Sequence, residues 1–264
     1  MYEKIEELRV RGFRSLGAEV KLRLRTSMAL VGGPGSGASE LCDALRFLQE
    51  CVQEGLDVAL ERRGGLEALL QEGTDSFELE VLAGHGNWSF VVGRALDRPF
   101  RVERESMHYF DVGDRLVYDY QAEDGRWTGH SKPWLEVARE PGPGRLGLPT
   151  MTEEPFFREL LPVLRQMWFA SPSGASFIDG DAEGGFSRWL RATDSSLVVL
   201  EEPERTLSPE KLPGFVEAIH RVSRWERVLL STQSPALMKW LSRNGPTVEV
   251  RAGVLRAIPF ERRD

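Results

Sequence analysis

The sequence predicts an α/β protein with a parallel central sheet and a separate antiparallel β region, and three observations lead to this class. First, the apolar run "MALVGG" (28–33) ends in glycines and precedes "SELCDALRFLQECV" (39–52), whose apolar residues recur at helical spacing. Second, residues 195–260 alternate short apolar strands with helices, the pattern of a parallel sheet. Third, residues 77–121 form short strands separated by turn signals, which is typical of an antiparallel meander.

Composition places the chain among folded globular proteins. Its 264 residues are 41% hydrophobic and 28% charged, which is enough to bury a sizeable core. No apolar run approaches the roughly 20 residues that a membrane span needs, and "MYEKIEELRV" is too charged for a secretory signal. We therefore expect a cytoplasmic protein without a membrane role. The net charge of −7 argues against a surface coated in basic residues for wrapping nucleic acid, but is compatible with a local basic strip.

The first part of the chain, residues 1–76, is predicted to hold two strands, the glycine loop and its helix. "EELRVRGF" (6–13) and "EVKLRLR" (19–25) alternate apolar and charged residues, so each reads as a half-buried strand. The glycine loop joins the buried strand 28–31 to the helix. Residues 77–138 then form the antiparallel insertion, with "FRVERE" and "MHYFDV" as two of its strands.

The remaining residues are predicted to form a small helical lobe and the rest of the parallel core. "TEEPFFRELLPVLRQMWF" (152–169) reads as one helix that Thr152 can cap, and it opens the helical lobe at 150–190. Residues 191–264 then complete the core. Their predicted order is strand "SSLVVLEEPE", helix "PEKLPGFVEAIHRV", strand "RVLLST", helix "SPALMKWLSR", and a closing hairpin of "TVEV" and "VLRAIPF".

The glycine loop "GGPGSGAS" (32–39) is a candidate phosphate-binding loop. It matches the pattern GxxxxGK[ST] at Gly32, Gly37 and Ser39, whereas Ala38 occupies the lysine position. Glycines permit a turn that aims backbone N–H groups at phosphates, and the following helix offers its positive end. The missing ammonium would supply a contact worth roughly 1.5–3 kcal/mol, so nucleotide binding should be weakened and hydrolysis more so. The alternative is that the loop is simply a turn. The predicted nucleotide-binding residues are Gly32, Gly35, Ser36, Gly37, Ala38, Ser39 and Glu40.

A second candidate element is "SLVVLEEPE", in which an apolar strand ends in two acids. Ligands of parallel α/β sheets bind outside the carboxyl ends of the strands. Glu201 stands where a magnesium-associated aspartate would be, with Ser39 as the second magnesium ligand, and Glu202 stands where a general base would be. For an isolated pair of acids, a solvated acidic cap at the strand end is the alternative.

Five segments in order resemble the ABC-type ATPase heads of the RecF, SMC and OLD group, in a compact AAA-type form. This resemblance spans nearly the whole chain and implies a P-loop NTPase fold with a mixed central sheet, an antiparallel β subdomain and a small helical lobe. It also implies ATP and Mg²⁺ as cofactors. The matching segments are "IEELRVRGFRSL", "VGGPGSGASELCDALRFL", "RRGGLEALLQEG", "VVLEEPERTLSP" and "VLLSTQSPALMKWL".

The departures from the family pattern fall on catalytic positions. Ala38 replaces the lysine, Glu201 replaces the magnesium aspartate, and Gln233 replaces the switch histidine; Ser208 also replaces a histidine. The family's signature segment should fall in 178–196, where only two consecutive glycines suggest it. The resemblance implies that two heads sandwich two nucleotides, and a degraded signature puts a symmetric sandwich in doubt.

The resulting hypotheses differ in how much chemistry survives. The first is an ATP-binding head with low or absent hydrolysis, a regulatory or structural subunit in a DNA-maintenance or phage-defence complex. The second is a pseudo-ATPase scaffold that no longer binds nucleotide. The third is a functional ATPase of the RecF/OLD-like group, with a non-standard phosphate contact in place of the loop lysine. The implied partner is a protein, either a second copy or an active ATPase or nuclease subunit, and DNA is reached through that partner.

Overall fold

The computed structural model divides the chain into two compact units, each described here by itself. The antiparallel unit comprises Met1–Arg23 and Asp43–Arg165, and the parallel unit comprises Leu24–Cys42 and Gln166–Asp264. The residues that the structure describes are 4–16, 19–24, 28–113, 115–130, 142–150, 157–170, 195–205, 207–222, 227–242, 247–251 and 253–258.

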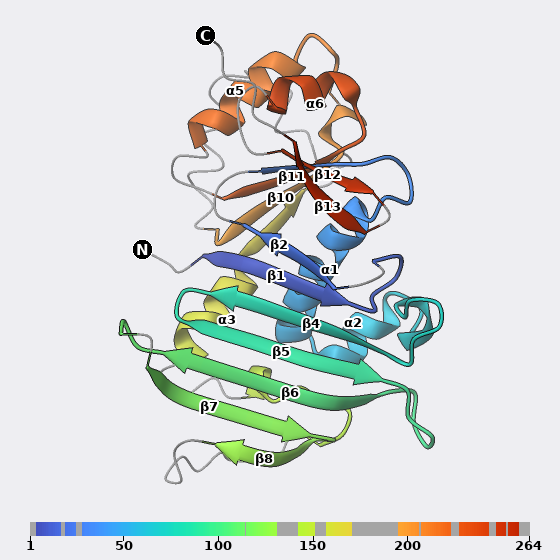
Figure 1. Ribbon diagram of the computed structural model, residues 1–264, viewed down its shortest axis with the longest axis vertical. Helices are drawn as coiled ribbons and strands as arrows, with labels where there is room; N and C mark the ends of the chain where they lie inside the picture. The colour runs from blue at the N-terminus through green and yellow to red at the C-terminus, as the bar shows by residue number, and fades with distance from the viewer. Residues whose placement is uncertain are drawn as a thin grey trace. The chain divides into compact units, whose positions relative to one another are not determined.

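The antiparallel unit is built on a seven-stranded sheet in the order β2-β1-β4-β5-β6-β7-β8 (Figure 1). The strands are β1 (Ile5–Arg11), β2 (Val20–Arg23), β4 (Ser76–Ala83), β5 (Gly86–Gly93), β6 (Arg101–Phe110), β7 (Leu116–Glu123) and β8 (Arg126–His130). Successive residues of β4 alternate between half-buried and buried, as expected when one face of a sheet packs on a core and the other meets water. The alternating sequence therefore determines which face becomes core.

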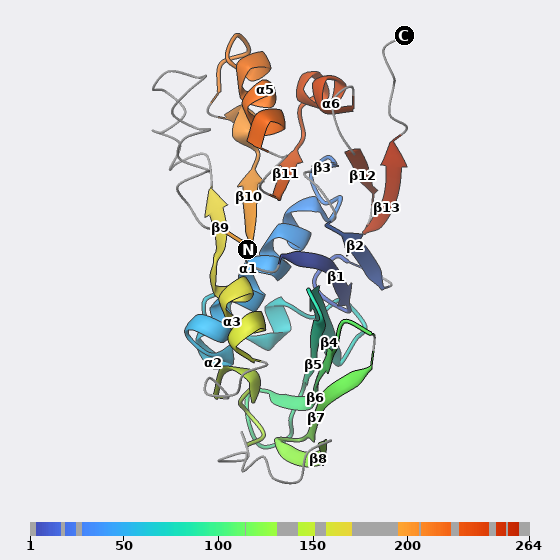
Figure 2. The same cartoon turned by 90° about the vertical axis from the view of Figure 1, so that its left-hand side faces the viewer.

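Helices cover the apolar face of this sheet. Figure 2 shows α2 and α3 on one side of the strands. The helical elements are α1 (Ala38–Gln53), which begins in the parallel unit, α2 (Leu56–Glu61), α3 (Phe157–Arg165) and the 3₁₀ turns η1 (Leu66–Ala68) and η2 (Leu148–Thr150). The ring centroids of Phe13, Phe47 and Phe77 lie 5.4–6.1 Å apart and join the turn after β1, helix α1 and strand β4 in one aromatic cluster.

The parallel unit contains a six-stranded sheet in the order β13-β12-β3-β11-β10-β9. The strands are β3 (Met28–Val31), β9 (Met167–Ala170), β10 (Leu197–Glu201), β11 (Val228–Thr232), β12 (Thr247–Arg251) and β13 (Val254–Ile258), and the helical elements are η4 (Pro203–Arg205), α5 (Leu212–Val222) and α6 (Pro235–Ser242). All neighbouring pairs are parallel except the β12–β13 hairpin. The predicted parallel core and closing hairpin are confirmed.

One face of the parallel sheet packs against α5 and α6. Val198 and Leu200 of β10 lie in a buried cluster with residues of both helices, including Phe215 and Leu237. Side chains alternate along a strand, so Glu201 projects from the opposite face to Leu200. It does so together with Ser231 of β11, its register partner. The carboxyl ends of β3, β10 and β11 meet at one edge of the sheet, where the glycine loop leaves β3.

Three sequence-based expectations need correction. The strands β1 and β2, expected in a P-loop core of residues 1–76, pair within the antiparallel sheet because β1 hydrogen-bonds to β4. The helix expected to run to residue 169 ends at Arg165, and Met167–Ala170 forms β9 because parallel pairing with β10 overrides the helical pattern. The two strands expected at 100–112 form the single strand β6.

Several predicted features fall on undescribed positions. The expected signature segment, including Gly184 and Gly185, lies outside the described residues apart from Ser195 and Ser196. The predicted cap Thr152 and most of the expected helical lobe at 150–190 are also outside them. Among the residues that are described, no helix is long and apolar enough to cross a membrane.

Candidate functional site

The predicted loop and acid residues meet in one hollow of the parallel unit. The hollow measures about 30 Å³ and lies at the carboxyl ends of β3, β10 and β11. Its lining consists of Gly32, Gly33, Pro34, Gly35, Ser36, Gly37, Ala38, Ser39, Glu40, Glu202, Ser231, Thr232 and Gln233. It thus brings together every predicted nucleotide-binding residue with Glu202 and Gln233. Glu201, the predicted magnesium acid, is not part of this described lining.

The turn between β3 and α1 depends on its glycines. Gly35 and Gly37 have φ angles of 72° and 104°, in the region that favours glycine. Gly32 is required for a different reason, because a Cβ added there would lie 2.8 Å from the Val250 carbonyl oxygen and even closer to the Ser36 side chain. The loop is further held by Ser36, whose carbonyl accepts from the Gly253 N–H at 2.8 Å.

Helix α1 begins directly at the lysine-replacing residue. The Ala38 N–H approaches the Ser36 Oγ at 3.4 Å, and the Leu41 N–H donates to the Gly37 carbonyl at 3.1 Å. The Ala38 methyl group is buried. This 16-residue helix therefore presents its positive end to the hollow, as a phosphate-binding loop does.

The charges around the hollow are unusual for a phosphate site. Its described lining includes the acids Glu40 and Glu202 but neither a lysine nor an arginine. Backbone N–H groups and the helix end are the features that attract an anion here, and the two carboxylates oppose them. An anionic ligand therefore needs a cation from outside this lining, or a bound metal ion, to offset the acids.

The Glu202 carboxylate is already engaged at both oxygens. Gln233 donates its side-chain N–H to Oε1, and the Arg205 Nε lies 2.6 Å from Oε2. The backbone of Glu202 has a φ of 45°, an uncommon conformation for a residue other than glycine. Its N–H donates to the Ser231 carbonyl at 2.9 Å. Gln233, at the switch-histidine position, thus contacts the predicted general base itself.

Glu204 organises the segment after β11 and was not anticipated from the sequence. Its Oε1 accepts from the Thr232 hydroxyl at 2.6 Å, the Gln233 N–H at 2.7 Å and the Ser234 N–H at 3.2 Å. Three donors on one carboxylate oxygen fix the backbone that carries Gln233. The sequence signal was the third acid of "EEPE", but only the fold shows which loop this acid supports.

The donor set fits a magnesium-bound phosphate better than a metal ion alone. Among the described residues no group of three or more His, Cys, Asp or Glu side chains could hold a metal. Mg²⁺ usually takes only one or two protein ligands and receives the rest from phosphates and water. Of the two predicted ligands, Ser39 lines the hollow, whereas Glu201 ends the strand β10 and is not part of the described lining.

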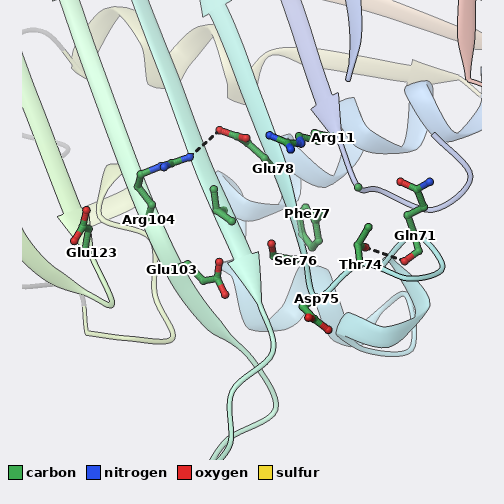
Figure 3. Close-up of a pocket in the computed structure, with 12 residues that line it drawn as sticks. Arg11, Gln71, Thr74, Asp75, Ser76, Phe77, Glu78, Glu103, Arg104 and Glu123 are labelled. Carbon is green, nitrogen blue, oxygen red and sulfur yellow. Dashed lines mark hydrogen bonds and ion pairs between the residues drawn. The ribbon is translucent and has the colours of Figure 1, made fainter. Parts of the chain in front are cut away.

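A larger hollow of about 510 Å³ lies in the antiparallel unit (Figure 3). It is lined by Arg11, Gly12, Gln71, Thr74, Asp75, Ser76, Phe77, Glu78, Val91, Glu103, Arg104 and Glu123. Figure 3 shows Glu78 joined to Arg104, and Glu103 pairs with Arg101 at 3.2 Å. The acids Glu78 and Glu103 are thus balanced by arginines of the same sheet, and the lining does not single out a ligand.

Comparisons with known proteins give likenesses in structure only. No protein-family model and no curated protein sequence matches the chain. The SMC head domain from Thermotoga maritima is 14% identical with a TM-score of 0.44, over 98% of this chain and 99% of that one. An Smc head domain with an extended coiled coil, bound to the C-terminal domain of ScpA derived from Pyrococcus furiosus, is 12% identical with a TM-score of 0.47, over 97% and 96%. The recombination mediator RecF with ATP is 10% identical with a TM-score of 0.44, over 97% and 100%.

These likenesses carry no information on the ligand or activity of this chain. The P-loop type of fold is instead evident from the chain's own topology. In the parallel unit, β3 is followed by the glycine loop and the start of α1, and β11 lies between β3 and the acid-ended β10.

Proposed function

We propose that this chain is an ABC-type ATP-binding head in which nucleotide binding is weakened and hydrolysis is low or absent. The observation that carries the proposal is the engagement of Glu202 by both Gln233 and Arg205, beside a phosphate-type loop without a lysine. A general base must be within reach of the attacking water and able to accept its proton. Contacts at both oxygens hold the Glu202 side chain in its present orientation and restrict its turning toward an attacking water.

Phosphate is proposed to bind on the backbone of the glycine loop. The N–H groups of Gly35, Gly37 and Ser39 at the start of α1 are the proposed donors, and the Ser39 hydroxyl is the proposed magnesium ligand. Bound Mg²⁺ would neutralise part of the charge on the phosphates and would ease their approach to Glu40 and Glu202. ATP with Mg²⁺ is therefore the proposed ligand.

A second candidate is a working ATPase whose phosphate contact comes from outside the loop. Arg205 favours this candidate, because its guanidinium forms an ion pair with Glu202, which lines the hollow. An arginine always carries its charge and can pair with phosphate through two N–H groups. The two candidates agree on the binding site and differ in whether phosphate is released.

Phosphate release separates them. The wild-type protein, Glu202→Gln and Ala38→Lys are each incubated with ATP and Mg²⁺, and inorganic phosphate is measured over many hours. The proposed function predicts that wild type releases no more phosphate than Glu202→Gln. If wild type turns over ATP and Glu202→Gln abolishes this activity, the proposal of a silent head is wrong and the second candidate is supported.

The proposed role is that of a regulatory or structural subunit in a DNA-maintenance or phage-defence complex. Support comes from the five motif segments of the sequence, whose family resemblance implies paired heads. The partner is either a second copy of this chain or an active ATPase or nuclease subunit, through which DNA is reached. Light scattering with and without ATP and Mg²⁺ tests whether two copies pair. If they do, the measured mass should double when nucleotide is added.

A further inference from the structure

A buried hydroxyl without a hydrogen-bond partner lies in the lining of the loop hollow. Ser231 is 2% exposed, and its Oγ has no partner among the residues that the structure describes. Buried polar groups are nearly always hydrogen-bonded, and each exception calls for an explanation. Because this hydroxyl lines the hollow formed by the glycine loop, a ligand atom bound there is the natural partner.

A cationic side chain, that of Arg205, contacts a residue that lines the same hollow. Arg205 pairs with Glu202 at 2.6 Å, and its side chain is 66% exposed, so it is free to reorient toward solvent or toward the hollow. The Glu202 side chain in this pair is mostly buried, with 13% of it exposed. When a polyphosphate enters beside Glu202, the guanidinium gains a stronger anionic partner than a single carboxylate.

We propose that Ser231 and Arg205 together replace the missing loop lysine as phosphate contacts. Ser231 donates its hydroxyl hydrogen to a phosphate oxygen at the base of the hollow, and Arg205 turns from Glu202 to the terminal phosphate. This inference rests on the nucleotide site of the proposed function, which both candidate functions share; the phosphate-release test above measures whether hydrolysis follows once Arg205 has left Glu202. It adds an opening step to that site, because Arg205 must release Glu202 for binding.

Each contact has a matched control in the same unit. Ser195 precedes β10 and is also a buried serine whose hydroxyl has no described partner, but it lies at the amino end of that strand, away from the hollow. Arg251 is an exposed arginine paired with Glu249 at 2.7 Å and does not line the hollow. Ser195→Ala and Arg251→Ala therefore reproduce the chemical change without touching the site.

The test is calorimetric titration of each variant with ATP and Mg²⁺, together with the melting temperature of the nucleotide-free protein. Ser231→Ala and Arg205→Ala are each expected to weaken binding by about tenfold, the size of one hydrogen bond to a charged group. Both controls should bind as wild type does. Ser231→Ala should not lower the melting temperature, because it removes a buried hydroxyl that has no partner; a purely structural serine would lower it.

The outcomes distinguish failure of the Ser231 and Arg205 contacts from failure of the nucleotide site as a whole. If wild type binds and either Ser231→Ala or Arg205→Ala binds equally well, the inference is overturned while the proposed nucleotide site stands. If wild type shows no binding, both are overturned. If both variants bind ATP more weakly and both controls bind as wild type does, the inference and the proposed nucleotide site are supported.

Discussion

At the scale of single residues, two neighbouring glycines of the loop have different roles. Gly32 has no room for a side chain, because an added Cβ would lie 2.8 Å from the Val250 carbonyl. Gly33 has open space around the same position. The pattern of glycines was evident from the sequence, but only the packing of β12 against the loop shows which glycine is required for the fold.

Gly32→Ala is therefore expected to destabilise the parallel unit by about 1–3 kcal/mol, the usual cost of forcing extra volume into a packed site. Gly33→Ala is its matched control and should change stability by no more than about 0.5 kcal/mol. Chemical denaturation of both variants measures the difference. Equal effects would contradict the close approach of Val250 to the loop.

At the scale of elements, ion pairs centred on Glu7 of β1 link β1 to β2 at the edge of the antiparallel sheet. Its carboxylate lies 2.7 Å from Arg9, 3.0 Å from Lys21 and 3.2 Å from Arg23, and the side chain is 9% exposed. Burial alone would raise the pKa of Glu7, but the hydrogen bonds and charges of Lys21 and Arg9 hold it below its ordinary value of 4.5.

The sign of the pH dependence follows from that direction. A carboxyl group whose pKa is lower in the folded chain stabilises the fold above pH 4.5, and this contribution disappears as pH falls through the folded pKa. Glu7→Gln should thus lower the free energy of unfolding by about 1 kcal/mol at neutral pH and by progressively less below pH 4.5. Urea unfolding of both proteins from pH 7 to pH 3 checks this. A difference that stays constant with pH would show that the charge of Glu7 is irrelevant.

A second link between elements is the buried carboxylate of Glu105 in β6. It accepts from the Trp88 indole N–H at 2.8 Å, the Gly147 N–H at 2.6 Å and the Leu148 N–H at 3.0 Å. Burial raises the pKa of Glu105, and these hydrogen bonds oppose that rise. The carboxylate thereby fastens the segment around η2 to the sheet.

Replacing this carboxylate with an amide leaves at least one donor without an acceptor. Glu105→Gln should lower the free energy of unfolding by about 1–3 kcal/mol. Glu103→Gln, two residues away and partly exposed, is the matched control and should have little effect. If the two substitutions prove equally mild in urea unfolding, Glu105 does not anchor this segment.

At the scale of the whole molecule, periodicity and motif order predicted most of the architecture. Apolar runs located β3, β10 and β11, because fully buried parallel strands leave a continuous apolar signature. The same signal could not assign β1 and β2 to a sheet, since partner strands are chosen by pairing across long sequence separations. The strand β9 was mistaken for helix because parallel pairing with β10 decides its conformation.

The candidate site was predictable to a similar degree. The glycine motif and the paired acids placed the loop and Glu202, which line one hollow, while the roles of Arg205, Glu204 and Ser231 emerged only from three-dimensional contacts. No spacing rule connects an arginine three residues after an acid with a loop that lies about 170 positions earlier.

The central claim is that this loop still binds nucleotide without its lysine, and titration calorimetry with ATP and Mg²⁺ tests it most directly. We predict weak binding by the wild-type protein and tighter binding by Ala38→Lys, because the restored ammonium adds a contact of roughly 1.5–3 kcal/mol. The same titration with a non-hydrolysable analogue should give the same affinity. Absence of binding by both proteins would contradict the claim and leave the fold as a scaffold for a protein partner.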